Sequence, residues 1–405
     1  MALCGLCTEV QFKYFCRLYR IMRIVHICIS SPYIDGWGYQ ENILSRYLVK
    51  AGCDNHVIAS ANDFPSYLPE SAVSAIKAMG TEYDCEGSHI HRIRTFAMTS
   101  SVEFSRELIA TLERIRPDVI FHHDVVFSTL PAVSRYAHRS GAVLMVDNHA
   151  DELNITANRA WRWLYHKLLN RAACAVAGRD VAVYYGVTPG RCSFLEKYYH
   201  IPSSKISFLP IGADVDAAAL ISSREQLREH FGISRDAFVV VSGGKMSVSK
   251  GTSDLVTAVG SLREEGLDVE LLLFGQFEDD ESREAASGKE YVHVHGWCDR
   301  RKTLELLKLS DIACWSVQHT TLIEDAVSVG TPLLLKETPS TSHLVETNGG
   351  FVSGGSDALA CDIRHFVEMA PVEQANLREG CVRMKAKIGY DAIARRILDD
   401  YEALR

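Results

Sequence analysis

Short apolar runs alternate with amphipathic stretches along almost the whole chain. Stretches such as 41–50, 104–116, 130–139 and 302–309 carry apolar residues at the spacing of a helix with one buried face. Short buried strands that alternate with such helices predict parallel sheets built from βαβ units, so the expected fold class is α/β. The expected strands are 23–30, 56–59, 90–93, 119–122, 143–146, 173–177, 205–209, 237–242, 269–274, 292–295, 312–315 and 332–335.

The strand, glycine loop and helix that open a Rossmann-like domain occur twice. SSPYIDGWGYQEN (30–42) follows the first strand, and GGKMSVSKG (243–251) follows a strand in the second half. We therefore expect two Rossmann-like domains, each with a ligand-facing loop at the carboxyl ends of its strands. The predicted divisions are an N-terminal extension at 1–21, a first domain at 22–203, a second at 204–388, and a C-terminal helix at 389–405 that packs back on the first domain.

The first 21 residues do not fit the pattern of the rest. They are rich in Cys, Phe and Tyr, with basic residues interleaved, and they lack the apolar core and small-residue cleavage site of a signal peptide. Two interpretations remain open: an upstream translated extension, or a basic and aromatic segment at a membrane surface.

Composition restricts the classes of function. A net charge of −8 argues against bulk nucleic-acid binding, and no apolar run is long enough to predict a transmembrane helix. The 12 cysteines are scattered, and several lie in apolar runs, as reduced thiols of a cytoplasmic protein do. Cys4 and Cys7 form one C-x-x-C without a second pair at zinc-site spacing.

The GGKMSVSKG loop carries the clearest chemistry. Gly243 and Gly244 allow close approach of the backbone, and Lys245 and Lys250 add positive charge before a helix at 252–262. The N-terminus of a helix offers unpaired N–H groups and a partial positive charge, so this is a candidate phosphate site. It is not a Walker P-loop, because G-x-x-x-x-G-K-[ST] is absent.

Several motifs in order resemble glycosyltransferase family 4, whose members are retaining enzymes with the two-domain GT-B fold. The resemblance covers about residues 22–400 and includes KISFLPIGADVD, VVVSGGKMSVSKG, LLLFGQF, HVHGW, LKLSDIACWS and IEDAVSVGTPLLL. It implies a nucleotide-sugar donor, UDP- or GDP-linked, in the second domain and an acceptor against the first. It also implies that Lys245 and Lys250 hold the departing diphosphate, where preplaced cations act without a metal ion or other cofactor.

The same resemblance assigns further donor contacts. The family's ribose-binding carboxylate corresponds to Asp325, with Glu324 as the alternative if the register slips. The carboxylate that the family carries eight residues earlier is replaced by Val317. Gln318, His319 and Thr320 are the nearby polar candidates for the sugar contact, and a surface position for His319 is the competing interpretation.

In the first domain, His149 matches the family histidine near the donor sugar, with Asp147 and Asp151 close in sequence. A structural cap is the competing interpretation. Gly36 and Gly38 form the glycine loop expected to face the donor phosphates. We expect one of three neighbouring residues to line the acceptor side: His122, His123 or Asp124.

Residues 158–175 mix Arg, Lys, Trp, Tyr and Leu at helical spacing. This composition suits a helix at a membrane surface and suits an ordinary packed helix equally well. The oligomeric state, the sugar and the pathway are not specified by the sequence.

We predict a cytoplasmic, metal-independent retaining glycosyltransferase that serves a glycan or lipid-linked acceptor, in cell-surface polysaccharide or glycoconjugate synthesis. Two alternatives remain. One is another GT-B enzyme, a nucleotide-sugar epimerase. The other is a catalytically silent nucleotide-sugar-binding or scaffold subunit, which Val317 favours.

Overall fold

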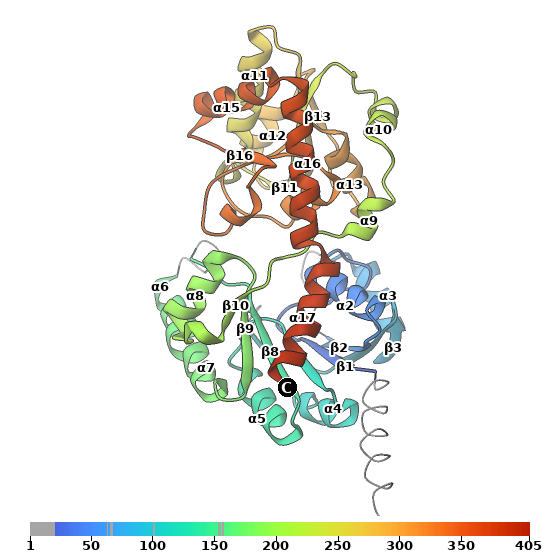
Figure 1. The fold of residues 1–405 in the computed structure, drawn as a ribbon, viewed down its shortest axis with the longest axis vertical. Coiled ribbons are helices and arrows are strands. Elements are labelled where there is room, and N and C mark those ends of the chain that lie inside the picture. Colours follow the sequence, from blue (N-terminus) through green and yellow to red (C-terminus); the bar gives the residue numbers. More distant parts are fainter. Residues whose placement is uncertain (1–20, 63, 65–67, 100–101, 153–154, 156–157) are drawn as a thin grey trace, which may run out of the picture.

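The computed structural model describes residues 21–405 except 63, 65–67, 100–101, 153–154 and 156–157. These residues form two α/β units, one above the other in Figure 1, which confirms the predicted fold class. The extension at 1–21 lies almost entirely outside the described residues, so its two interpretations stay open.

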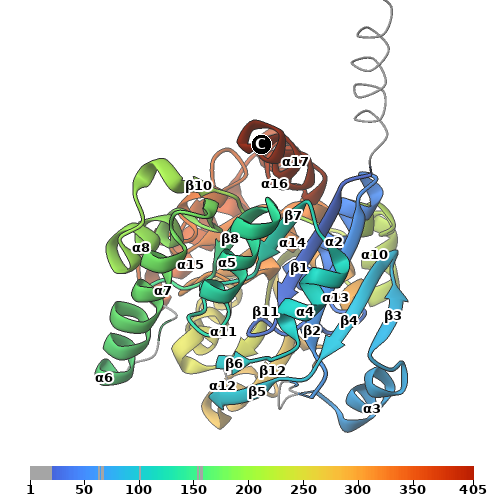
Figure 2. The same cartoon turned by 90° about the horizontal axis from the view of Figure 1, so that it is seen from below.

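The first sheet has eight strands in the order β10-β9-β8-β7-β1-β2-β4-β3. All neighbours are parallel except β3 and β4. Figure 2 shows β1, β2, β4 and β3 following one another toward one edge. The strands are β1 (Arg23–Cys28), β2 (Asp54–Ser60), β3 (Glu82–Cys85), β4 (Ser88–Ile93), β7 (Val119–His122), β8 (Val143–Asn148), β9 (Val181–Gly186) and β10 (Ile206–Phe208), and β5 (Phe96–Thr99) and β6 (Val102–Phe104) form a separate hairpin.

Helices cover both faces of this sheet, as the apolar character of both faces requires. Val25 and Ile27 of β1 pack into one core and Ile24 into the other, the alternation expected of a strand. The helices are α2 (Gln40–Lys50), α3 (Glu70–Ala78), α4 (Leu108–Ile115), α5 (Leu130–Ser140), α6 (Arg159–Arg162), the π-helix η1 (Trp163–Asn170), α7 (Arg171–Ala177), α8 (Pro189–Tyr199) and the 3₁₀ turn η2 (Ser203–Lys205).

One predicted strand is wrong. Residues 173–177 belong to α7, and the strand β9 follows it. Ala173, Cys174 and Ala177 are buried at helical spacing, and alanine is the strongest helix former. Val and Tyr dominate β9, and they favour strands. Residues 206–208 pair with β9, so the chain leaves the first sheet after Phe208 rather than near 204.

The second sheet is parallel throughout, in the order β13-β12-β11-β14-β15-β16. Its strands are β11 (Phe238–Met246), β12 (Val269–Phe277), β13 (Val292–Val294), β14 (Ile312–Trp315), β15 (Leu333–Leu335) and β16 (Gly349–Phe351). Its helices and 3₁₀ turns are α9 (Val215–Ala219), α10 (Arg224–Phe231), η3 (Val248–Lys250), α11 (Thr252–Glu264), α12 (Asp280–Ala286), α13 (Arg300–Leu309), α14 (Leu322–Val329), η4 (Ser342–Leu344), α15 (Ser356–Glu368) and α16 (Pro371–Ile388).

The C-terminal helix α17 (Tyr390–Leu404) returns to the first domain. Figure 1 shows it running from α16 down beside α2. Tyr390, Ile393 and Ile397 share a buried cluster with Leu44 and Leu48 of α2. Burial of this apolar surface holds the C-terminal helix against the first domain.

The two chain crossings between the domains are joined to each other. Ala213 N donates to the carbonyl of Ile388 at 2.8 Å, and Tyr390 N donates to the carbonyl of Ala213 at 3.1 Å. The Tyr390 ring lies against Gly212, where an added Cβ would come within 2.6 Å of ring carbons. Among the described residues, no helix is both long and apolar enough to span a bilayer.

Because the Gly212 contact leaves no room for a methyl group, we expect Gly212→Ala to destabilise the fold. Overpacking of a filled core costs about 1–3 kcal/mol in the free energy of unfolding. Gly355→Ala is the matched control, since nothing lies within 4 Å of its added Cβ. Denaturant unfolding measures both. Equal stability of the two variants would contradict the tight crossing.

Candidate active site

A pocket of about 160 Å³ lies at the carboxyl ends of β11 and β14. It gathers six of the residues that the sequence predicted for the donor side, from three separate segments. The lining residues are Ser242, Gly243, Lys245, Met246, Lys250, Thr252, Trp315, Gln318, His319 and Thr320. Gly244 lies next to this lining, while Asp325 and the candidates of the first domain are not part of it.

The glycines of this pocket lie in a strand rather than in a loop, because β11 continues to Met246 beside β12. Gly243 is packed under the Phe274 ring, where an added Cβ would come within 2.4 Å. Gly244 has φ +103, a conformation that L side chains rarely adopt. Strand packing and backbone geometry therefore both require glycine here, and they bring the bare backbone to the pocket.

Lys245 and Lys250 approach the pocket from different elements. Lys245 is near the end of β11, and its Nζ lies 3.3 Å from a carboxylate oxygen of Glu278. Lys250 ends η3, just before the first turn of α11, whose first residue Thr252 also lines the pocket. Two ammonium groups and the N-terminus of a 13-residue helix thus converge on one small cavity.

His319 is not at the surface. Its side chain is 7% exposed, and its Nε2 lies 2.8 Å from Oε1 of Glu324. The other carboxylate oxygen of Glu324 is buried without a hydrogen-bond partner among the described residues. Val317 is 38% exposed and lies close to Gly251. Because this residue is a valine, the carboxylate that the family carries at this position is missing from the pocket wall.

Asp325 is buried and forms an ion pair with Arg300 of α13. Burial raises the pKa of Asp325, although the Arg300 charge and hydrogen bond oppose this shift. Arg300 also lies 3.8 Å from Asp214, which accepts hydrogen bonds from Arg46 and Tyr47 of the first domain. The predicted ribose contact is therefore engaged in a chain of charges that crosses the domain junction.

The predicted glycine loop of the first domain lies against Arg300, one of the charged residues at the domain junction. A Cβ added to Gly38 would lie 3.2 Å from the Arg300 side chain, so this position is a close approach between the domains. Gly36 has φ +74 and open space around it, as a turn glycine does.

A buried carboxylate organises the cleft face of the first domain. Asp147, at the end of β8, lies 2.9 Å from His123 Nδ1 and 3.2 Å from His149 Nε2 and accepts a hydrogen bond from the backbone N–H of Asp124. Burial favours its protonated form, but the charges and hydrogen bonds of His149 and His123 hold the pKa of Asp147 well below its usual range.

His149 is the matching cation. Burial disfavours its charge, but the carboxylate of Asp147, assisted by Glu41, raises the pKa of His149 to about 9. Its side chain remains about a quarter exposed, so the imidazolium can reach a ligand in the cleft. Glu41, His123 and His149 also place ligand atoms within 4.8 Å of one another, a group that could hold a cation.

Of the three residues 122–124, His123 belongs to this cluster, while His122 is structural. The His122 ring contacts the carbonyl of Asp124 at 2.8 Å and the hydroxyl of Thr129 at 2.9 Å. Burial lowers the pKa of His122 to about 4. His123 is backed by a residue that sequence reasoning missed, His26 of β1, whose Nδ1 lies 2.9 Å from His123 Nε2.

Sequence reasoning also missed Arg191. It lies in the first turn of α8, where the side chain of Thr188 caps the helix. Its Nη1 is buried without a hydrogen-bond partner among the described residues, and its Nε lies 3.4 Å from Asp151. The charges of both Glu324 and Asp147 act on it. The Thr-Pro-Gly start of a helix directly after a strand was the available signal.

Arg191 therefore links the two halves of the site. Asp151 accepts a hydrogen bond from Ser340 of the second domain, and Ser340 also contacts Thr188. Through Arg191 and Glu324, the His149 cluster and the His319 wall of the pocket lie within electrostatic reach of each other. The geometry suits an anionic ligand that bridges the domains.

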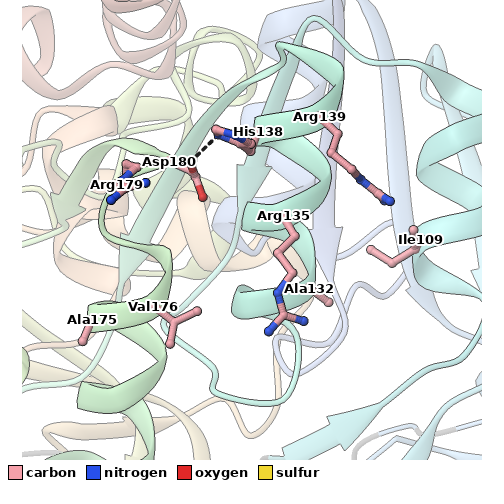
Figure 3. A pocket seen from close by; sticks show the side chains of 9 residues that line it. All are labelled: Ile109, Ala132, Arg135, His138, Arg139, Ala175, Val176, Arg179 and Asp180. Atoms are coloured by element: carbon pink, nitrogen blue, oxygen red, sulfur yellow. Dashed lines mark hydrogen bonds and ion pairs between the residues drawn. The ribbon is translucent and has the colours of Figure 1, made fainter.

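A larger hollow, of about 690 Å³, lies on the flank of the first domain between α5 and α7 (Figure 3). Arg135, Arg139 and Arg179 line it, and His138 pairs with Asp180 at 3.0 Å. The predicted donor residues are absent from its lining.

The sequence profile described as Glycosyltransferase Family 4 matches residues 43–217. A GDP-mannose-dependent alpha-(1-6)-phosphatidylinositol dimannoside mannosyltransferase of Mycobacterium tuberculosis is 22% identical over 286 residues, which cover 68% of this chain and 71% of that protein.

Solved structures share the fold. HepE of Anabaena in complex with UDP superposes with a TM-score of 0.70 at 14% identity, over 94% of this chain and 100% of that one. A sucrose-phosphate synthase of Thermosynechococcus elongatus superposes with a TM-score of 0.67 at 16% identity, over 95% of this chain and 99% of that one. These similarities confirm the GT-B fold. With the profile match over residues 43–217 and the mannosyltransferase relative, they identify the protein as a glycosyltransferase that is similar to those of family 4.

Proposed function

We propose that this glycosyltransferase moves a sugar from a nucleoside diphosphate donor to a glycan or lipid-linked acceptor, with retention of the anomeric configuration. The observation that carries the proposal is the pocket in which Lys245, Lys250 and the N-terminus of α11 converge. A pocket with this charge suits a diphosphate.

Breaking the bond between sugar and phosphate builds negative charge on the departing diphosphate. Lys245, Lys250 and Thr252 at the start of α11 line the pocket, and we assign to these cations and N–H groups the stabilisation of that charge. In a retaining transfer of this kind, the departing phosphate accepts the proton of the acceptor hydroxyl on the same face. No enzymic nucleophile is then required.

Known donors of similar proteins narrow the choice of nucleotide. HepE was solved with UDP-glucose, and the mycobacterial relative is named as GDP-mannose-dependent. We propose a UDP- or GDP-linked hexose. Asp325 pairs with Arg300 through one carboxylate oxygen, and the second oxygen of Glu324 is buried without a partner among the described residues, so these two carboxylates are the candidates for the ribose contact.

On the first-domain side, we assign His149 to the hydroxyl groups of the donor sugar. A charged imidazole donates a stronger hydrogen bond than a neutral one, and Asp147 keeps it charged at neutral pH. The unpartnered Nη1 of Arg191 adds a second donor toward the same region.

We further propose that the first domain contacts an anionic membrane surface. The sequence has no acidic residue from 153 to 179, and α6, η1 and α7 carry exposed Trp163, Leu168 and Val176 among basic side chains. The basic hollow of Figure 3 adjoins α7. Positive charge beside exposed apolar groups complements anionic headgroups, which fits a lipid-linked acceptor and a role in cell-surface glycoconjugate synthesis.

Val317 favours a second candidate, a subunit that binds the donor without turnover. A panel of UDP and GDP sugars, tested for binding by thermal shift and for transfer or hydrolysis by product analysis, separates the two. Binding without turnover in the presence of glycan and lipid-linked acceptors would support the silent subunit.

Replacing Lys250 with Ala should lower kcat/KM, because the loss of one charge-stabilising donor raises the free energy of the transition state by about 2–4 kcal/mol. Lys289→Ala, which removes an exposed lysine over the Tyr291 ring, is the matched control and should leave the rate unchanged. Steady-state kinetics with the best donor measure both. Unchanged turnover in Lys250→Ala would refute the diphosphate assignment.

His149 should set an alkaline limit on activity. Its raised pKa means that the charged imidazole persists to about pH 9 and is lost above it. In Asp147→Asn the carboxylate that raises the pKa is gone, so the fall in kcat/KM should move toward the ordinary imidazole pKa of about 6.5. Profiles of kcat/KM against pH measure the shift.

The control for this shift is Asp180→Asn, which removes the partner of His138 on the far flank and should leave the profile unchanged. If the alkaline limb stays near pH 9 in Asp147→Asn, another group is responsible. Titration of the His149 ring by NMR separates a shifted pKa from a general loss of activity.

Vesicle sedimentation tests the membrane contact. Wild-type protein should bind vesicles with anionic lipid, less so at high salt, and Trp163→Asp should weaken binding. Trp297→Asp is the matched control, because Trp297 is also exposed but lies in the second domain. Absence of binding, or an equal loss in both variants, would contradict the assigned surface.

A further inference from the structure

A second group of titratable side chains lies far from the cleft, at the opposite ends of the strands. Asp54 begins β2, His56 follows two residues later on the same face, and His89 is its register partner on β4. The sequence pattern did not single out these residues, because Asp54 and His89 are 35 positions apart and only the parallel pairing of β2 and β4 brings them together.

The three side chains direct potential ligand atoms at one point. Oδ1 of Asp54 lies 3.1 Å from His56 Nε2 and 3.6 Å from His89 Nε2, and all three atoms lie within 4.8 Å of one another. Ligand atoms around a tetrahedral zinc ion are separated by about 3.3–3.5 Å, so both separations from Asp54 are close to those of a zinc site.

His56 shows that these contacts are not ordinary hydrogen bonds. Its Nε2 is buried and makes no hydrogen bond of acceptable geometry, although Asp54 is close. A buried imidazole nitrogen that faces a carboxylate oxygen without hydrogen-bonding to it is an arrangement that a shared metal ion would satisfy.

The outer atom of each ligand is held by a second residue. His89 Nδ1 lies 2.6 Å from Asp84 Oδ1, His56 Nδ1 lies 3.0 Å from His91 Nε2, and Arg23 Nε donates to Asp54 Oδ2 at 2.6 Å. Such partners fix the ring orientation of metal-binding histidines and make them better ligands.

A surface hollow of about 460 Å³ gives access to the group, and His89 is about half exposed. Figure 2 shows β4 between β2 and β3, the edge strand that carries Asp84.

We propose that Asp54, His56 and His89 bind a divalent transition-metal ion of the zinc type, with water completing the coordination. Two imidazoles and one carboxylate suit Zn²⁺, whereas Mg²⁺ prefers oxygen ligands alone. The ion ties β2 to β4 and, through Asp84, to the edge strand β3. It takes no part in the sugar transfer, so the site stands or falls independently of the proposed function.

Calorimetric titration of the full chain with Zn²⁺ tests the proposal. We expect one ion per chain in the wild type, an increase in melting temperature with Zn²⁺ but not with Mg²⁺, and loss of both effects in His89→Ala. Asp84→Asn, which removes only the partner of His89, should weaken zinc affinity by about 10–100-fold. His138→Ala is the matched control, since it disrupts a His–Asp pair without a third ligand and should bind zinc as the wild type does.

Zinc could also bind to cysteine thiolates or to the His149 cluster in the cleft, and two measurements distinguish these sites from the proposed one. Cobalt substitution reveals thiolate ligands by their charge-transfer absorption, which a site of nitrogen and oxygen ligands lacks. Binding that disappears in His149→Ala rather than in His89→Ala would place the ion in the cleft and overturn the proposal. Equal binding by wild type and His89→Ala, or no stoichiometric binding by the wild type, would overturn it as well.

Discussion

The buried charge of Asp147 is the constraint on which the cleft of the first domain depends. A carboxylate at the end of a central strand is costly to bury unless cations and N–H groups surround it. Here the partners come from two neighbouring strand ends, His123 and the Asp124 backbone beyond β7 and His149 just beyond β8. The same electrostatic need that orients His149 also makes it a cation, so stability and function rest on a single interaction.

The second constraint is the fixed relation of the two domains. The chain crosses between them twice, and Ala213 joins the crossings by backbone hydrogen bonds to Ile388 and Tyr390. Helix α17 then buries an apolar face against α2. Near the cleft, Arg300 forms an ion pair with Asp325 and lies against Gly38. The hydroxyl of Ser340 donates a hydrogen bond to Asp151. Backbone hydrogen bonds, apolar packing and polar contacts beside the cleft together hold the two domains against each other.

The sequence predicted the fold well, because buried parallel strands and amphipathic helices leave strong periodic signals. It failed at 173–177, where an alanine-rich apolar run fits a helix as well as a strand. The sequence also singled out Lys245, Lys250 and other residues that line the same pocket, because these residues lie in short ordered motifs. It did not find Arg191, His26 or the pairing of Asp325 with Arg300, because these contacts join segments distant in sequence. His319 lines the pocket, but its burial against Glu324 follows only from the turn before α14.

Hydrogen–deuterium exchange with and without UDP-glucose or GDP-mannose tests most directly whether a nucleotide sugar binds between the domains. Binding between the domains should slow exchange in three separate segments: the end of β11 through the start of α11, residues 316–328, and the segment around His149. Protection confined to the flank between α5 and α7, or no protection with any nucleotide sugar that the protein binds, would contradict it.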